Sequence, residues 1–407
     1  MRKYLLAGAS AALLALITAP PAAQAHNGHH HGPATACKTT ELACASVVST
    51  TFGSDGKLWL VWAAGGRISV ASSTDLGQHI STPVMLPKTE SGLDDGPDAR
   101  AKIAVGSAGE VIVTFATRDE KYNGHAFITR SNDGGKTFAT PEPITSNSPS
   151  QRFETAVITP DGRAFVAWID KRNMAAAKKA GIPYEGAALA YAWSDKTGGK
   201  LETATIARDN TCECCRISVA FDAASEPVVM FRNIFDGGIR DHAVIAFSNA
   251  GKPGELHRVS DDDAKIDACP HQGPTLAIGP QDVYHATWFA LGRKLKGNYY
   301  ARSEDNGKTF STPVHLGRTG TQTSRPYVLA TANKVYLVYK SFDGEKTDIE
   351  LMTSADAGKT WDAPRVAAST GDESDHPLLV ADKTGNAYLS WMTVKDGYRL
   401  IPLEPQS

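Results

Sequence analysis

Seven short stretches of this chain share one pattern, in which three or four strand-forming residues lead into an aromatic residue. The aromatic residues are Trp62, Phe115, Trp168, Phe231, Trp288, Tyr339 and Trp391. Their position numbers place them 51 to 63 residues apart. A repeat of about 50 residues built from short strands indicates an array of small sheets, because one such sheet cannot bury its own faces. Closing the array into a ring protects the sheet edges, so the sequence predicts an all-β fold, a β-propeller.

The charge balance excludes two classes of partner. The 407 residues include 42 Lys and Arg against 44 Asp and Glu, and the formal net charge is −2. Binding to nucleic acid or to a membrane surface needs an excess of basic residues, so neither partner is expected. Because the repeat runs through the chain, we expect a single propeller domain over residues 37–407, present as a monomer.

The N-terminus has the pattern of a secretory signal. Arg2 and Lys3 precede a short apolar run at residues 7–17, and Ala23-Gln24-Ala25 forms a small-x-small cleavage site. The run is too short to span a bilayer. The sequence therefore predicts a signal peptide over residues 1–25, a His-rich flexible segment over residues 26–36, and a periplasmic or secreted protein that does not span a membrane.

A second motif recurs in the turn between the third and fourth predicted strands of a unit. Residues 131–138, 303–310 and 354–361 each read S-x-D-x-G-x-x-F or S-x-D-x-G-x-x-W, and weaker copies begin at Ser73 and Ser194. The Asp side chain accepts hydrogen bonds from the N–H groups of the turn, and the Gly supplies a positive φ. This motif is the Asp box, and we interpret it as a structural turn.

With these repeats the chain resembles the sialidase-like superfamily, whose members carry BNR or Asp-box repeats. The resemblance implies a propeller with its Asp boxes at the periphery of the blades, away from the active site. Catalytic sialidases resemble six-bladed propellers, whereas seven units here predict seven four-stranded blades, with six as the alternative. The last unit ends at its third strand near residues 398–403, so we expect the segment after Cys37 to supply the fourth.

Arginine or histidine occupies an equivalent position at the start of the first strand in six of the seven units, and serine does so in the first unit, 14 to 17 residues before the aromatic. These positions are Ser46, Arg100, Arg152, Arg216, His271, Arg325 and His376. The first strand of a propeller blade lines the central channel, and arginine at a concave site binds carboxylate or phosphate through two parallel hydrogen bonds. We therefore expect Arg100, Arg152, Arg216, Arg325 and His376 to bind a small anionic ligand at the channel mouth. The alternative is that each arginine pairs with a loop aspartate such as Asp95, Asp98 or Asp267.

The resemblance to sialidases implies a specific set of catalytic candidates. They are Arg100, Arg152 and Arg325 as a carboxylate-binding triad, Tyr327 as nucleophile with Glu154 as its partner, and Asp98 or Asp95 as the acid. Three departures count against activity. The family's Phe/Tyr-Arg-Ile-Pro segment is absent, since the corresponding place reads ACASVVST, and Tyr327 has no glutamate near it in sequence. The count of seven units also shifts the geometry of the site.

The cysteines cluster at the same predicted mouth. Cys212, Cys214 and Cys215 precede the fourth unit, and Cys269 with His271 precedes the fifth. Thiolate and imidazole are the ligands that Cu(I) and Zn prefer, and His26 would add an imidazole and an α-amine at the mature N-terminus. The alternative is disulfide formation, with Cys37 bound to Cys44 and the C-x-C-C segment bound to Cys269.

Three functions follow from these residues. The favoured one is an exported, non-catalytic propeller that binds a soft transition metal, copper before zinc, or a ligand at the channel mouth. The second is an exo-α-sialidase-type glycoside hydrolase. The third is a propeller that binds a glycan or a protein partner through the arginine-lined mouth.

Overall fold

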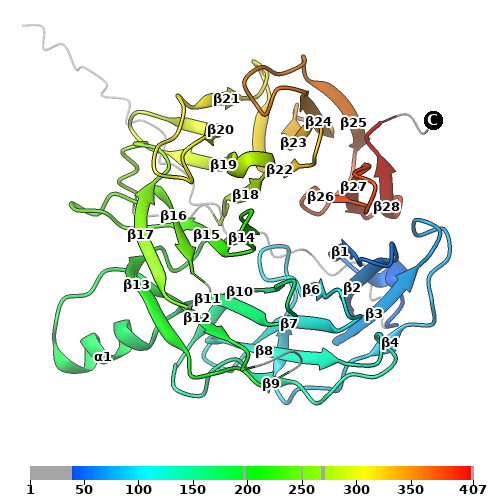
Figure 1. Ribbon diagram of the computed structural model, residues 1–407, viewed down its shortest axis with the longest axis vertical. Coiled ribbons are helices and arrows are strands. Elements are labelled where there is room, and N and C mark those ends of the chain that lie inside the picture. The colour runs from blue at the N-terminus through cyan, green and yellow to red at the C-terminus, as the bar shows by residue number, and fades with distance from the viewer. Residues whose placement is uncertain (1–38, 196–198, 249–250, 267–270, 405–407) are drawn as a thin grey trace, which may run out of the picture. The chain divides into compact units, whose positions relative to one another are not determined.

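The computed structural model describes residues 39–195, 199–248, 251–266 and 271–404, and these form a ring of seven antiparallel sheets (Figure 1). By its internal contacts the chain divides into Met1–Ala36 and Cys37–Ser407, and the ring is the second of these units. The prediction of an all-β, seven-bladed propeller is confirmed, and the six-bladed alternative is wrong. The proposed signal peptide and the His-rich segment, with His26, lie outside the described residues.

The strands follow one another along the chain in the order of the blades. Blade 1 contains β1 (Val48–Phe52), β2 (Leu58–Ala64), β3 (Arg67–Ser73) and β4 (Val84–Met85). Blade 2 contains β5 (Gly92–Asp94), β6 (Lys102–Val105), β7 (Val111–Arg118), β8 (Gly124–Ser131) and β9 (Glu142–Pro143). Blade 3 contains β10 (Gln151–Ile158), β11 (Ala164–Asp170), β12 (Ala187–Trp193) and β13 (Thr205–Thr211). Blade 4 contains β14 (Ser218–Phe221), β15 (Pro227–Arg232), β16 (His242–Phe247) and β17 (Pro253–Arg258).

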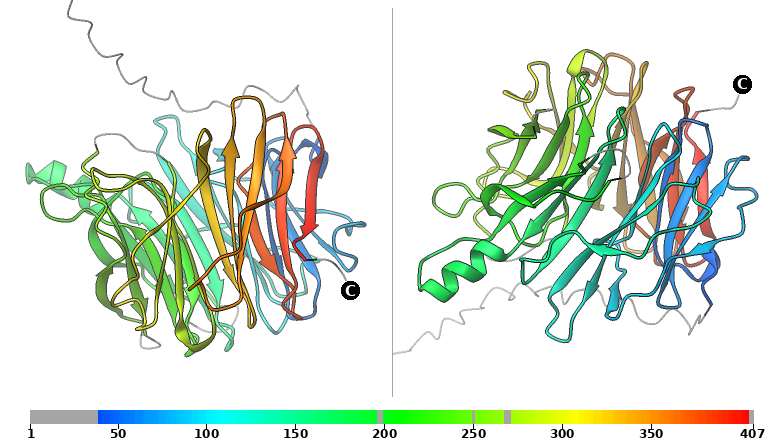
Figure 2. Two further views of the ribbon diagram at one scale, coloured as in Figure 1. Left: turned by 90° about the horizontal axis from the view of Figure 1, so that it is seen from above. Right: turned by 60° about the horizontal axis from the view of Figure 1, so that its bottom comes forward.

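Three further blades complete the ring. Blade 5 contains β18 (Thr275–Ile278), β19 (Tyr284–Leu291), β20 (Lys296–Ser303) and β21 (Val314–Leu316), with the 3-10 turn η2 (Pro280–Asp282) between the first two. Blade 6 contains β22 (Gln322–Ala330), β23 (Val335–Phe342), β24 (Thr347–Ser354) and β25 (Arg365–Thr370). Blade 7 contains β26 (Leu378–Ala381), β27 (Ala387–Thr393) and β28 (Gly397–Pro402). A short helix, α1 (Arg172–Ala180), follows β11 and stands out from the rim of the ring (Figure 2).

The repeated aromatic residue is the core of each blade. It lies in the strand that follows the innermost one, and every copy is at most 3% exposed. Apolar clusters join neighbouring blades: one includes Phe165 of blade 3 with Phe231 of blade 4, and another includes Met230 of blade 4 with Trp288 of blade 5. Burying such a side chain stabilises the fold by about 1.5–3 kcal/mol, and so the pattern recurs in every unit.

The Asp boxes form turns at the end of the ring opposite the channel mouth. Ser131 pairs with Val111 at the start of β7, whereas Arg118 at the end of β7 lies near the mouth. The Gly135 N–H donates to Ser131 Oγ at 2.8 Å, and the Thr137 N–H donates to Asp133 Oδ1 at 3.0 Å. The same bonds recur in the boxes that begin at Ser303 and Ser354, which supports the interpretation of these boxes as structural turns.

Blade 2 departs from the regular pattern at its inner edge. Both β5 and β6 pair with β7, at its two ends. The innermost strand is thus interrupted, and residues 95–101 leave the sheet between its two halves. This interruption carries Asp98 and Arg100 toward the channel.

In the described part of the chain, the segment after Cys37 does not add the fourth strand to blade 7 that the sequence predicted. Blade 7 has three strands in the described part of the chain, and residues 39–47 contain one 3-10 turn, η1 (Leu42–Cys44), and no strand. Instead, β1 contacts β26 and β27, and Val48 shares a core cluster with Met392. Residues before 39 lie outside this description. No helix among the described residues is long and apolar enough to cross a membrane.

Candidate functional site

The channel mouth is built by the beginnings of the seven innermost strands. Each of these strands contacts the next one around the ring, from β1 through β6, β10, β14, β18, β22 and β26 back to β1. The four arginines predicted from the repeat stand at or just before four of these strands, and all four form ion pairs with aspartates. The aspartates come from other blades, so the ion pairs join sequence-distant segments.

Two arginines converge on one carboxylate. Arg325 of blade 6 donates from Nη1 to Asp98 Oδ1 at 2.8 Å and from Nη2 to Oδ2 at 3.4 Å. Arg216, just before blade 4, places its Nε 3.3 Å from the same Oδ1. The register of β22 breaks between Ser324 and Tyr327, and Arg325 has a φ of 56°. A bulge of this kind redirects a side chain, and here it accompanies the arginine that reaches Asp98 across the channel.

Arg100 is committed to a different partner. It is 4% exposed and donates from both Nη atoms to the two carboxylate oxygens of Asp375, which is 3% exposed. It also donates to the backbone oxygens of Val48 and Pro97. Since Asp375 directly precedes blade 7, this buried pair joins blade 2 to blade 7 past blade 1. Arg100 therefore has a structural role in this conformation, and its ion pair with Asp375 is called the clasp below.

Arg152 forms its ion pair with a third carboxylate. Its Nη2 is 3.7 Å from Asp94 Oδ2, which also lies 3.0 Å from Arg118 Nε. Its guanidinium also lies 4.5 Å from the centre of the Phe153 ring. Arg100, Arg216 and Arg325 act on one another electrostatically, and Asp98 acts on Arg152 as well.

Among the described residues that form this connected set at the mouth, cations outnumber carboxylates. The connected cations are Arg100, Lys102, Arg118, Arg152, Arg216, Arg325 and Lys340, and the connected carboxylates are Asp94, Asp98, Glu154 and Asp375. Burial lowers the pKa of Lys340 to about 8 and that of Arg216 to about 10, and neighbouring arginines add to both shifts. An anion in the channel would relieve this repulsion.

The structure does not bring the predicted nucleophile and its glutamate into hydrogen-bond contact. Within the described residues no carboxylate accepts a bond from the Tyr327 hydroxyl, and Arg216 and Arg100 are the charges that act on it. Burial raises the pKa of Tyr327. Glu154 is fully buried, and its carboxylate lies 3.9 Å from Lys102 Nζ.

His376 is placed at the mouth but is not a cation there. It is 6% exposed, and its backbone N–H donates to Asp375. Burial, with Arg325 and Arg216 nearby, holds the pKa of His376 well below its usual value. Of the alternative partners named from the sequence, Asp98 pairs with two arginines, whereas Asp267 lies outside the described residues.

The C-x-C-C segment forms a compact sulfur cluster. The sulfur atoms of Cys212, Cys214 and Cys215 all lie within 4.8 Å of one another. Cys212 Sγ is 3.4 Å from Cys214 Sγ and 3.8 Å from Cys215 Sγ. Cys212 and Cys215 are free thiols, each 2% exposed, whereas Cys214 and Cys44 are not free. The cluster adjoins the arginine site, because Cys215 and Arg325 act on each other electrostatically.

The cluster has an asymmetric electrostatic environment. The hydrogen bond shared with Cys215 lowers the pKa of Cys212 to about 6, with Arg232 and Arg240 contributing, and raises the pKa of Cys215. Cys269 lies outside the described residues. His271 is exposed, its φ is 50°, and its backbone oxygen accepts a bond from Arg325. Its side chain does not join the sulfur cluster in the described structure.

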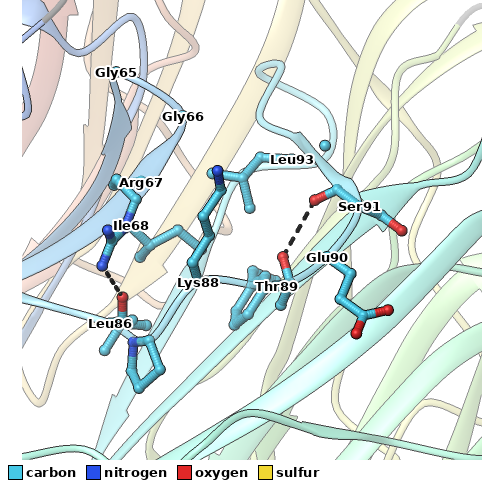
Figure 3. Close-up of a pocket in the computed structure, with 13 residues that line it drawn as sticks. Gly65, Gly66, Arg67, Ile68, Leu86, Lys88, Thr89, Glu90, Ser91 and Leu93 are labelled. Carbon is cyan, nitrogen blue, oxygen red and sulfur yellow. Dashed lines mark hydrogen bonds between the residues drawn. The ribbon is translucent and has the colours of Figure 1, made fainter.

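A cavity of about 500 Å³ lies away from these residues, between the hairpin at Gly65 and Gly66 and the loop from Leu86 to Leu93 (Figure 3). Arg67 Nη2 donates to the Leu86 oxygen at 2.8 Å on one side of it. None of the predicted site residues lines this cavity. We therefore place the candidate site at the channel mouth, where the charged groups converge.

Several residues of the mouth carried no signal in the sequence analysis. Asp94, Lys102, Lys340 and Asp375 were missed because each has a partner in another blade. Asp375 could have been found, since it directly precedes His376 in the counted register. Arg232 had no comparable signal, because it ends an apolar strand.

The comparisons with known proteins show the fold and no closer kinship. No family model and no curated protein matches the chain. Among solved structures, the Hadza microbial sialidase Hz136 is 13% identical, with a TM-score of 0.51 over 85% of this chain and 76% of that one. An ulvan lyase of family PL25, bound to -[GlcA(1-4)Rha3S]-, is 9% identical, with a TM-score of 0.58 over 89% and 94%. The polysaccharide lyase Uly1 is 9% identical, with a TM-score of 0.55 over 88% and 90%.

These likenesses define the class of the protein. It is a seven-bladed β-propeller, and this fold is similar to that of the sialidase and of the polysaccharide lyases named above. Identities this low show that the fold is shared, but they do not show that the reaction or the ligand is shared.

Proposed function

We propose that this protein is an exported propeller that binds a small carboxylate-bearing ligand at the channel mouth. The observation that carries the proposal is the convergence of Arg216 and Arg325 on the single carboxylate of Asp98. Two guanidinium groups from different blades already hold a carboxylate there. The Nη atoms of Arg216 make no hydrogen bond to the described residues, so they remain available to a ligand.

The charge of the mouth and one structural neighbour support an acidic sugar as the ligand. The connected cations outnumber the carboxylates, and an anion entering a partly desolvated channel meets that excess at close range. The ulvan lyase of similar fold is bound to a fragment that contains glucuronic acid. A uronate carboxylate matches the fork of donors that arginine presents.

The binding test compares charged and neutral sugars. Calorimetric titration of wild type should detect glucuronate and not glucose, and Arg216→Met should weaken glucuronate binding by about tenfold, which corresponds to about 1.4 kcal/mol. Arg302→Met, which removes a guanidinium paired with Glu304 in blade 5, is the matched control and should change nothing. Equal binding of the two sugars, or an unchanged affinity in Arg216→Met, would refute the proposal.

We further propose that the protein does not hydrolyse sialosides. A sialidase tyrosine needs a carboxylate beside it to act as nucleophile, and Tyr327 has no such hydrogen bond among the described residues. We expect no turnover of a fluorogenic sialoside. Turnover that disappears in Tyr327→Phe and in Arg325→Ala would show instead that the mouth is a glycosidase site.

A second candidate function, binding of a soft metal ion, rests on the sulfur cluster. Two free thiols 3.8 Å apart lie close enough for one ion to reach both, since a metal–sulfur bond is about 2.3 Å. Thiolates prefer Cu(I) among the common ions, so copper is favoured. Anaerobic titration of Cu(I) against a competing chelator should give one ion per chain, and Cys212→Ser with Cys215→Ser should abolish it. Equal affinity in wild type and the double variant would exclude the site.

Export and disulfide formation complete the proposal. We propose that the signal peptide is removed before His26, and that Cys44 bonds to Cys37 and Cys214 to Cys269. With Cys214 so engaged, Cys212 and Cys215 remain as the metal ligands. Intact mass and thiol counting of the exported protein should show cleavage after Ala25 and two free thiols. An unprocessed chain, or six free thiols, would contradict these assignments.

A further inference from the structure

Arg232 is a buried arginine with unused hydrogen-bond donors. It ends β15, is 2% exposed, and donates from Nη2 to the Phe289 oxygen at 2.8 Å. Its Nε and Nη1 are buried and have no hydrogen-bond partner among the described residues. No carboxylate within the described ranges lies at ion-pair distance from it. Arg232 acts electrostatically on Asp262 without direct contact, and burying a charge that has no counter-ion in contact is costly.

The charge of Arg232 acts on the two free thiols, as it does on His242 and Asp262. The Cys212 N–H donates to the Arg232 oxygen at 2.9 Å, and the charge of Arg232 acts on both Cys212 and Cys215. A second guanidinium approaches from the turn before β16, where Arg240 Nη1 donates to Cys212 Sγ at 3.6 Å. Two cations thus adjoin one pair of sulfur atoms.

The remaining charged and titratable groups around Arg232 have their own partners or are neutral. Asp262 accepts from Ser260 Oγ at 2.7 Å and from Trp288 Nε1 at 2.9 Å. His242 pairs opposite Arg232 in the sheet, and its buried ring is kept neutral. Asp98, the carboxylate that acts on Cys215, is held by Arg216 and Arg325.

We propose that Arg232 and Arg240 make the Cys212–Cys215 pair selective for a monovalent soft ion, Cu(I), over the divalent Zn(II). This inference rests on the metal-binding function proposed above. Two thiolates around a monovalent ion form a complex of charge −1, which the two guanidinium groups stabilise. Two thiolates around a divalent ion form a neutral complex, so the guanidinium groups lose their partner and face the ion's own charge.

Ligand number favours the same ion. Structural zinc takes four ligands in a tetrahedron, whereas Cys214 is the one further ligand that the described structure places within 4.8 Å of the pair, and it is not a free thiol. A Zn(II) ion would therefore have to complete its shell from groups that do not adjoin the pair in the described structure. Charge and coordination thus both disfavour zinc.

The experiment measures the affinities for Cu(I) and Zn(II) separately, each by anaerobic competition with a chromophoric chelator. The proteins are wild type, Arg240→Met, Arg232→Met and the control Arg302→Met. Both cluster variants should bind Cu(I) at least about tenfold more weakly and Zn(II) no more weakly than wild type, so that the ratio of the two affinities falls. The control should keep the wild-type ratio.

Two results would overturn the inference in distinguishable ways. If Arg240→Met keeps the wild-type ratio, the selectivity proposal fails while the metal site stands. If wild type binds neither ion although its two thiols are free, the metal-binding function itself fails and the selectivity fails with it. Arg240 is only partly buried, so its variant should fold and decide the question even if Arg232→Met does not.

Discussion

Burial determines the protonation state of the histidines inside the ring. His285 is 1% exposed, its Nδ1 shares a hydrogen bond with the Tyr300 hydroxyl at 2.7 Å, and burial lowers the pKa of His285 to about 4. Burial likewise holds the pKa values of His242 and His376 well below the usual range. All three imidazoles are therefore still neutral at the pH values at which exposed histidines begin to take up a proton.

This neutrality predicts a loss of stability in mild acid. The unfolded chain takes up a proton at His285 near pH 6.5, whereas the folded state does so only near pH 4, so unfolding takes up a proton between these values. The free energy of unfolding should fall as the pH drops from 6.5 to 4, by up to about 1.4 kcal/mol per pH unit for each such histidine. Chemical denaturation at several pH values should show a smaller slope in His285→Gln. The exposed His315→Gln should keep the wild-type slope, and an unchanged slope in His285→Gln would contradict the prediction.

The arginines illustrate which part of the site a sequence can reveal. Counting back from each aromatic residue located Arg100, Arg152, Arg216 and Arg325, because the register of a strand is local. The same count could not say which carboxylate each would meet, since Asp98 and Asp375 reach their arginines from other blades. Cross-blade pairing depends on how the ring closes, which no local pattern encodes.

Among the elements, the Asp-box turns show how one glycine serves both conformation and packing. Gly358 has a φ of +77°, and a Cβ added there would meet the Tyr300 hydroxyl of the preceding blade. Gly109 has a φ of +87° with no atom within 4 Å of an added Cβ. The two glycines thus share the left-handed backbone and differ in the space around them.

Alanine substitutions should separate these two contributions. Gly109→Ala should cost about 1–2 kcal/mol of unfolding free energy through backbone strain alone. Gly358→Ala should cost about 1–3 kcal/mol more, because the Tyr300 side chain of the preceding blade must also move away from the added Cβ. Urea denaturation of both variants gives the comparison, and equal losses would mean that the box does not support the neighbouring blade. Ligand affinity at the mouth should stay unchanged in both, since the boxes lie at the opposite end.

The elements that the sequence analysis missed are the irregular ones. Alternating strands and turn glycines repeat in every unit, and so the blades were predictable. The interruption at residues 95–101 has no periodic signal, yet it delivers Asp98 to the channel. The helix α1 is likewise an insertion into one blade. A prediction based on repeats cannot find such segments, because each of them occurs in one unit only.

For the molecule as a whole, the question is how a ring with a three-stranded seventh blade stays closed. Arg100 of blade 2 and Asp375 of blade 7 form a buried pair, and Asp375 also accepts from the Val48 N–H of blade 1 at 3.4 Å. The Asp375 backbone oxygen accepts from Trp391 Nε1 at 3.0 Å, which ties the clasp to the core of blade 7. One carboxylate therefore connects three consecutive blades at the point where blade 7 meets blade 1.

Breaking this clasp should destabilise the entire ring. Either Arg100→Met or Asp375→Asn leaves a buried group without its partner, and each should lower the unfolding free energy by about 3–5 kcal/mol. The double variant should lose less than the sum of the two, because the second change removes the unpaired group that the first one created. Asp55→Asn, which removes an exposed pair with Lys57, should cost less than about 1 kcal/mol and serves as the control. Urea denaturation of the four proteins completes the cycle. Additive losses, or single variants as stable as wild type, would mean that packing between β1 and blade 7 closes the ring without the ion pair.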